Sequence, residues 1–287
     1  MKTQASATEC ALMGLFDYAG MFQPAELDLR DAVRGYLEYR GGPHAWALGN
    51  LVLSAPQLCA LQEEPQDARH DLRLSVLATV ADLEMLQKYL DDGLPIKMIE
   101  LKVSKPDEIA RWNEKLFARV ATYVEMPVES QDSSVLEAIH NTGLRAKLRM
   151  GGVVAEAFPT GASVAAILKR LAERRIAFKA TAGLHHPLRS RHPFTYRQDS
   201  ESGMMHGFVN LLCASALVWF GADEGEAEQL LEEQDPRAWQ MSSDAVRWRS
   251  HHWSADQLRE VREHFLISIG SCSFTEPMHD LEALGWL

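Results

Sequence analysis

Segments with the pattern of β-strands alternate with segments with the pattern of α-helices along most of this 287-residue chain. The strand-like segments are apolar runs, and most are followed by a stretch with apolar residues at helical spacing. The predicted strands are residues 11–20, 47–54, 72–79, 96–103, 119–128, 145–150, the beginning of 176–187, and 245–251. Eight such repeats in a chain of this length predict one α/β domain, a (β/α)8 TIM barrel over residues 1–287.

The segments between the strands complete this pattern. We predict helices at residues 27–39, 56–64, 82–92, 105–116, 132–141, 163–174, 203–221, 224–233 and 255–269. The alternative fold is a doubly wound open sheet, which usually carries a GxGxxG loop after its first strand. Gly14 and Gly20 do not form one. Residues 187–203 are the longest irregular stretch, and a barrel places them over the active-site mouth as a lid-like loop. The tail at 270–277 follows the last predicted helix, so we expect it to pack on the opposite face.

The net charge of −11 narrows the class of partner. Nucleic-acid phosphates need a basic surface, so we predict a small-molecule substrate and no nucleic-acid partner. The cysteines form no CxxC pair, which favours reduced thiols in a cytoplasmic protein over a zinc site or a disulfide framework. They are Cys10, Cys59, Cys213 and Cys272. The sequence specifies no oligomeric state.

Residues 203–221 are nearly long and apolar enough to span a bilayer. They contain His206 and Asn210, and the acidic pair Asp223 and Glu224 follows directly. Helices that are apolar on all sides usually lie inside large domains. We therefore predict a buried core helix and no membrane partner. The N-terminus also lacks the apolar run of a signal peptide.

Two consecutive predicted strands each carry a cationic face. Lys179 and Thr181 alternate with Phe178 and Ala180, and the preceding strand alternates Arg145, Lys147 and Arg149 with apolar residues. Applied to all strands, this alternation predicts a polar inward set, which is Asp17, Asn50, Ser54, Ser75, Thr79, Glu100, Lys102, Glu125, Lys147, Arg149, Lys179, Thr181, Arg249 and His251. The predicted outward set is Ile99, Leu101, Val124, Leu148, Phe178, Ala180 and Trp248. Polar residues inside and apolar residues outside are what a catalytic barrel requires.

The buried lysines point to a reaction. A nucleophilic lysine must be neutral, and neighbouring cations favour that state, so we predict Lys179 as an imine-forming nucleophile perturbed by Lys147 or Arg149. Glu125 is the predicted proton shuttle. His185, in the loop after the strand, is a second candidate for moving protons. These catalytic roles require no cofactor.

The segment FKATAG at residues 178–183 resembles the lysine strand of deoxyribose-phosphate aldolase and its class I aldolase relatives. In that family a Schiff-base lysine and an activating lysine lie on adjacent strands 6 and 7, and Lys147 and Lys179 occupy the matching strands. The resemblance implies lyase or aldolase chemistry on a small, anionic carbonyl compound. The segment KLRMG that begins at Lys147 lacks the family's small hydroxyl residues. The resemblance therefore leaves open which of the two lysines forms the imine.

Polar side chains at the strand ends are the candidates for holding a substrate anion. The predicted substrate-binding residues are Arg149, Thr181, His186, Asp17, Asn50, Lys102, Arg249 and His251.

Two alternatives stay open. The first is a metal-dependent hydrolase or isomerase, in which His185, His186 and His251 with carboxylates such as Glu125 would hold a divalent metal. The sequence offers neither HxH nor HxxxH spacing for such a site. The second is a non-catalytic barrel in which Lys179 is paired with Glu125 or Asp17 and only binds a small anion.

Overall fold

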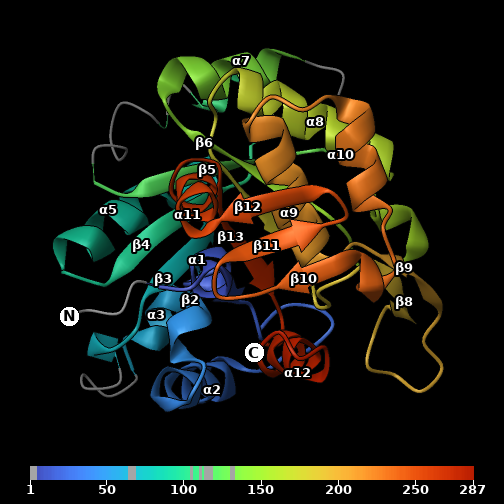
Figure 1. Cartoon of the computed structure of the whole chain (residues 1–287). Coiled ribbons are helices and arrows are strands. Elements are labelled where there is room, and N and C mark those ends of the chain that lie inside the picture. Colours follow the sequence, from blue (N-terminus) through green and yellow to red (C-terminus); the bar gives the residue numbers. More distant parts are fainter. Residues whose placement is uncertain (1–4, 64–68, 104–105, 110–111, 113–118, 130–132) are drawn as a thin grey trace.

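Eight parallel strands form a closed barrel, so the chain has the predicted TIM-barrel fold (Figure 1). The computed structural model describes residues 5–63, 69–103, 106–109, 112, 119–129 and 133–287. Around the barrel the strands follow the order β1 (Phe16–Tyr18), β13 (Leu266–Ser271), β7 (Phe178–Thr181), β6 (Arg145–Arg149), β5 (Ala121–Met126), β4 (Ile96–Leu101), β3 (Leu74–Ala78) and β2 (Leu48–Ser54). The predicted strands from 47–54 to the one after Ile176 are all confirmed.

Helices cover the outside of the barrel. They are α2 (Leu29–Gly41), α3 (Gln57–Leu61), α5 (Leu83–Asp91), α7 (Ser133–Thr142), α8 (Gly161–Glu173), α9 (Phe208–Trp219), α10 (Glu224–Leu231) and α11 (Ala255–His264). Most of the helix predicted at 105–116 lies outside the described residues. Helix α9 is the apolar segment of the sequence, and its residues from Phe208 to Val218 are all buried, which confirms it as a core helix. Within the described part of the chain, no helix is long and apolar enough to cross a membrane.

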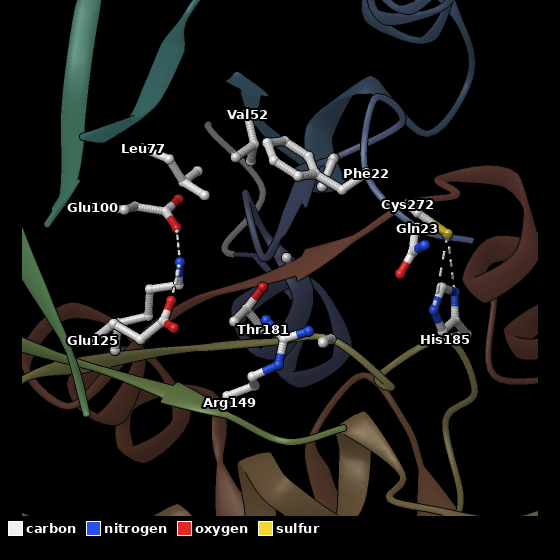
Figure 2. Close-up of a pocket in the computed structure, with 14 residues that line it drawn as sticks. Phe22, Gln23, Val52, Leu77, Glu100, Glu125, Arg149, Thr181, His185 and Cys272 are labelled. Carbon is white, nitrogen blue, oxygen red and sulfur yellow. Dashed lines mark hydrogen bonds and ion pairs between the residues drawn. The ribbon is translucent and has the colours of Figure 1, made fainter. Parts of the chain in front are cut away.

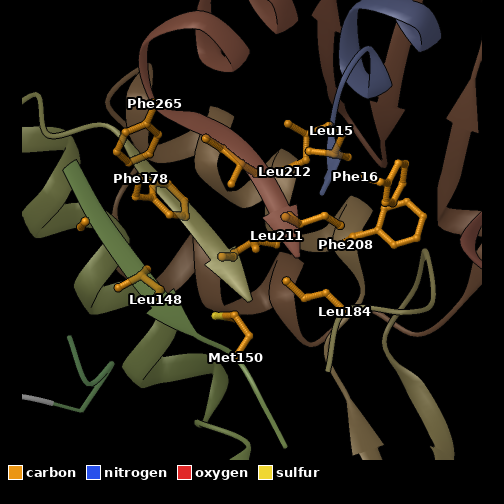
Figure 3. Close-up of a cluster of buried hydrophobic side chains, with 14 of the residues drawn as sticks. Leu15, Phe16, Leu148, Met150, Phe178, Leu184, Phe208, Leu211, Leu212 and Phe265 are labelled. Atoms are coloured by element: carbon orange, nitrogen blue, oxygen red, sulfur yellow. The ribbon is translucent and has the colours of Figure 1, made fainter. Parts of the chain in front are cut away.

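The outward faces of the strands form the core with the helices (Figure 3). Leu148 and Phe178 are fully buried, and the ring of Phe178 packs edge-on against Phe265 with 5.0 Å between centroids. Leu211 of α9 lies in the same cluster. The predicted outward residues of β4 to β7 are therefore confirmed. Burying such side chains stabilises each by roughly 1.5–3 kcal/mol, which holds the strand ends in place.

The beginning of the chain differs from the prediction of a strand at 11–20. Residues 7–12 form helix α1 (Ala7–Leu12), which Ser6 and Glu9 cap reciprocally. The chain then turns at Gly14, whose φ of 58° suits glycine, and only Phe16–Tyr18 is a strand. A short apolar run fits a buried helical turn as well as a strand, so the sequence pattern alone could not distinguish the two here.

The prediction that residues 245–251 form the eighth barrel strand is wrong. Those residues belong to a separate antiparallel sheet of β10 (Trp239–Met241), β11 (Ala245–Trp248) and β12 (His251–Ser254). Trp248 is buried in that sheet, not on the outside of the barrel. The strand that closes the barrel is β13, which follows α11 without an intervening glycine or proline and was read as the end of that helix.

The residues at 187–203 are more ordered than the predicted irregular loop. They include β8 (Ser190–Pro193), which pairs with β9 (Ser202–Met205) in a hairpin. The ring of Phe194 stacks on Phe158 with 5.3 Å between centroids. Tyr196, between the two strands, hydrogen-bonds to Glu276 of the final helix α12 (Thr275–Ala283) at 3.1 Å. The segment is therefore a packed hairpin fixed at its tip.

Candidate active site

A layer of buried polar side chains fills the inside of the barrel. It includes the two lysines of the cationic strands, which are register partners on β6 and β7. The buried polar residues of this layer are Asp17, Asn50, Ser75, Glu100, Lys147, Lys179 and Ser268. All but Ser268 belong to the inward set predicted by alternation, so that prediction is confirmed for these positions.

Asp17 and Lys179 form the deepest ion pair of this layer. The Lys179 ammonium group lies 2.7 Å from Asp17 Oδ2, and both side chains have 0% exposure. Asp17 also accepts hydrogen bonds from the Asn50 side-chain amide at 2.8 Å and from Ser268 Oγ at 2.7 Å. Gly49 leaves room for this carboxylate, because a Cβ there would lie 2.4 Å from Asp17 Oδ1. Asp17 is therefore the partner of Lys179, and Asn50 the partner of Asp17; both side chains are buried, and neither lines the cavity at the mouth of the barrel.

Glu100 joins the two lysines. Its Oε1 lies 2.6 Å from Lys179 Nζ and accepts a hydrogen bond from Ser75 Oγ at 2.7 Å, and its Oε2 lies 2.7 Å from Lys147 Nζ. Burial alone would raise the pKa of Glu100, but the two ammonium groups hold it well below its usual range. Burial alone would lower the pKa of Lys179, but Asp17 and Glu100 raise it above its ordinary value. Lys179 is therefore a cation at neutral pH, contrary to the neutral nucleophile predicted from the sequence.

Lys147, rather than Lys179, lines the cavity at the mouth of the barrel. The cavity has a volume of about 230 Å³. Lys147 contacts Glu100 and also Glu125, whose Oε2 lies 2.8 Å from its Nζ. The Glu125 side chain is 24% exposed, so it connects this buried lysine with solvent. Lys147 and Glu125 are thus the pair that a molecule in the cavity can reach.

Arg149 and Thr181 follow the two lysines by two residues on β6 and β7 and line the same cavity (Figure 2). Both follow the alternation of their strands, as predicted. Among the described residues, none hydrogen-bonds to the Arg149 guanidinium group or pairs with it. Gly270 of β13 packs against Thr181, since a Cβ there would lie 2.9 Å from Thr181 Oγ1. This side of the cavity can bind a carboxylate or phosphate.

His185 lies across the cavity from Glu125, as Figure 2 shows. Its Nδ1 is 3.1 Å from Glu276 Oε2, and the sulfur of Cys272 is 3.9 Å from its Nε2. Burial would lower the pKa of His185, but the hydrogen bonds with Cys272 and Glu276 raise it to about 9. The imidazole is therefore protonated at neutral pH and can donate a proton to a substrate oxygen.

The structure places the other predicted site residues outside this cavity. The His186 ring contacts Asp280 at 2.6 Å and stacks on His192. Lys102 lines a neighbouring hollow, which shares Glu125 and Arg149 with the cavity.

Arg249 and His251 lie outside the barrel, because their segment is not a barrel strand. Arg249 follows β11 and pairs with Glu233 at 2.6 Å. His251 of β12 lies 3.0 Å from Glu226. The prediction that these two residues bind substrate at the mouth of the barrel is therefore wrong. Among the described residues, no three His, Cys, Asp or Glu side chains come together as a group that could hold a metal ion.

Several residues of the site were missed in the sequence. Ser268, Gly270 and Cys272 belong to β13 or follow it directly, and Glu276 lies in the helix after it. The prediction that the tail at 270–277 packs opposite the site is wrong, because β13 brings it to the mouth. The alternation Ser268, Gly270, Cys272 was the available signal, but it was hidden within a predicted helix and tail.

Comparison with known proteins adds little to this geometry. No family model matches the chain, and no curated protein matches it. Among solved structures, an adenine deaminase from Arthrobacter aurescens is similar over 53% of this chain and 51% of its own, with 15% identity and a TM-score of 0.34. The chain thus spans about half the length of that structure, and the likeness says nothing about its substrate.

Proposed function

We propose that this chain is a lyase of the class I aldolase type, in which Lys147 forms a Schiff base with a small anionic carbonyl compound. One observation carries the proposal: Lys147 lines the cavity, whereas Lys179 has 0% exposure and is held by two carboxylates. A nucleophile must reach its substrate, so we assign the role of nucleophile to Lys147.

The neighbouring carboxylate supplies the proton transfer that this chemistry needs. Lys147 must lose a proton to become nucleophilic, and Glu125 accepts it at 2.8 Å. The amine then adds to the carbonyl carbon, and Glu125 returns its proton to the carbinolamine hydroxyl, which leaves as water and gives a protonated imine. When the C–C bond of a bound β-hydroxy carbonyl compound breaks, its electrons move to the imine nitrogen, and Glu125 takes the hydroxyl proton. An enamine on Lys147 and a free aldehyde result, and later hydrolysis restores the amine.

Lys179 acts in this proposal as a positioning residue. Its ammonium group fixes Glu100 Oε1 and so directs Oε2 at Lys147. Among the described residues that line the cavity, the cationic side chains of Lys147, Arg149 and His185 outnumber the carboxylates of Glu100 and Glu125. This balance favours an anionic substrate, which Arg149 and Thr181 would orient.

Borohydride reduction tests the nucleophile directly. The protein is incubated with pooled small aldehydes, ketones and 2-oxo acids, reduced, digested and mapped by mass spectrometry. We expect the adduct on Lys147, its loss in Lys147→Ala, and no change in the control Lys102→Ala, which removes an exposed lysine of the neighbouring hollow. An adduct on Lys179 would reverse the assignment, and the absence of any adduct would contradict the proposal for these carbonyls.

Two other functions predict different outcomes in the same experiment. Both lysines are paired with carboxylates, which is also what a non-catalytic barrel that binds a small anion would show. Such a barrel would give no adduct, but it would bind carboxylates or phosphates in the cavity. A metal-dependent hydrolase or isomerase using His185 and His186 would lose activity with EDTA, whereas the proposed imine chemistry should not change.

A further inference from the structure

A cysteine that the proposed reaction does not use faces the same cavity as Lys147. Cys272 lies one residue after β13 and lines the cavity, although only 5% of its surface is exposed. His185 lines the same end of the cavity. In Figure 2 the thiol and the imidazole point toward each other, across the cavity from Glu125.

An imidazole and a carboxylate lie next to the Cys272 thiol, and these are the groups that accompany the thiol in enzymes with a cysteine nucleophile. Glu276 Oε2 lies 3.1 Å from Nδ1 of His185, and the Cys272 sulfur lies 3.9 Å from both Nδ1 and Nε2. Because the carboxylate occupies Nδ1, Nε2 is the nitrogen that remains for exchanging a proton with the thiol. Ser271 Oγ, 3.4 Å from Nδ1, also contacts the ring. A carboxylate that orients an imidazole, which in turn contacts a thiol, is the arrangement that activates such a nucleophile.

The hairpin closes this cluster on its outer side. The phenol oxygen of Tyr196 lies 3.5 Å from the Cys272 sulfur and 3.1 Å from Glu276 Oε2. Three other titratable groups among the described residues interact with the cluster. Tyr18 interacts with Cys272, His186 with Glu276, and His192 with both His185 and Glu276. Burial raises the pKa of both tyrosines, so they stay neutral near pH 7. The charges that face the thiol are therefore those of the imidazolium and the carboxylate.

We propose that Cys272, activated by His185 and Glu276, is a second nucleophile of this cavity and takes the aldehyde group of a small molecule bound there. The choice of an aldehyde rests on the proposed function, which releases one into the cavity. The nucleophilic thiol itself does not depend on imine formation by Lys147.

The step is a reversible addition. The Cys272 thiolate donates an electron pair to the carbonyl carbon and forms the S–C bond. The π electrons of the C=O bond move to oxygen, which takes the proton from His185 Nε2. The product is a thiohemiacetal, and no oxidant or reductant is needed. Proton return to His185 and expulsion of the thiolate release the aldehyde unchanged.

Alkylation with iodoacetamide tests the thiol independently of any aldehyde. The Cys272 peptide is quantified by mass spectrometry after short exposures at several pH values. We expect the wild-type rate at pH 7 to exceed that of both variants, because the His185 imidazole assists loss of the thiol proton. In His185→Gln the rate at pH 7 should fall about tenfold or more. Glu276→Gln should lie between the two.

Cys59 provides the control in the same digest, since it is exposed and its rate should be equal in all three proteins. Equal rates and pH profiles at Cys272 in wild type and His185→Gln would overturn the activated thiol, as would a wild-type Cys272 that is not alkylated. Circular dichroism of each variant shows whether the fold is intact, and a misfolded His185→Gln is replaced by His185→Asn.

Glyoxylate labelled with ¹³C at its aldehyde carbon tests the adduct. The experiment uses Lys147→Ala, so that imine formation cannot account for the result. A thiohemiacetal signal that is lost in the double variant Lys147→Ala/Cys272→Ser supports the proposal, even if borohydride trapping fails in the wild type. If the Cys272 alkylation profile is as expected but no such signal appears, the aldehyde assignment is overturned.

Discussion

Lys179 is a cation enclosed by two carboxylates, and its removal would leave both of them buried with fewer partners. Asp17 and Glu100 have side-chain exposures of 0% and 2%. Breaking a buried ion pair from one side typically costs about 3–5 kcal/mol. We therefore expect Lys179→Met to lower the free energy of unfolding by about that amount, measured by urea denaturation at pH 7.

The double variant Lys179→Met/Asp17→Asn is the matched control for this prediction. It removes one of the two uncompensated charges, so it should recover part of the lost stability. A single variant that loses less than about 1 kcal/mol would show that the buried pair is not needed for the fold.

His185 makes stability depend on pH in a defined direction. Its pKa rises from 6.5 to about 9 in the folded chain. A raised folded-state pKa gives stability that is complete below pH 6.5 and lost as the pH rises through about 9. At 1.36 kcal/mol per pKa unit, this contribution is about 3 kcal/mol. Urea unfolding should therefore show wild type losing stability relative to His185→Gln between those pH values, and parallel curves would contradict the shift.

The polar residues of the site could be predicted from the sequence, but their depth could not. Alternation placed Glu100, Glu125, Lys147 and Lys179 inside the barrel, because side chains of a strand point to opposite faces in turn. Alternation does not say which layer a residue occupies. Lys179 was therefore predicted as the nucleophile, although its partners on β1 and β4 separate it from the cavity.

At the scale of elements, local pattern predicted strands β2 to β7 and failed at the two ends of the chain. Both failures concern segments whose surroundings decide their structure. The residues of β11 have the same alternating pattern as a barrel strand, but they pair antiparallel with β10 and β12. The residues of β13 continue the apolar pattern of α11, and only pairing with β1 and β7 makes them a strand.

The β8–β9 hairpin should be sensitive to a single methyl group at Gly203. A Cβ there would lie 2.3 Å from the ring of Phe194, which is itself buried. Overpacking of this kind typically costs about 1–3 kcal/mol. We expect Gly203→Ala to destabilise the protein by that amount in urea and to speed proteolysis at the hairpin. In the control Gly41→Ala, a Cβ meets nothing within 4 Å, so stability should hardly change. Equal behaviour of the two variants would contradict the packing of Phe194.

At the scale of the whole molecule, the small antiparallel sheet is part of the same core as the barrel. Trp239, Trp248 and Trp253 are buried in it and belong to the hydrophobic cluster that includes the barrel strands. The Ala7 N–H of α1 donates a hydrogen bond to the Ser243 carbonyl at 2.8 Å, which ties the sheet to the segment before β1. Elements that share one core are expected to unfold together.

We therefore predict one cooperative unfolding transition for the 287 residues, as the single-domain interpretation requires. In urea, tryptophan fluorescence, to which the three tryptophans of the small sheet contribute, should give the same midpoint as far-UV circular dichroism. The variant Ala7→Pro removes the amide hydrogen that bonds to Ser243 and should lower both midpoints equally. A fluorescence transition that precedes the loss of helix signal would instead show that the small sheet unfolds as a unit of its own.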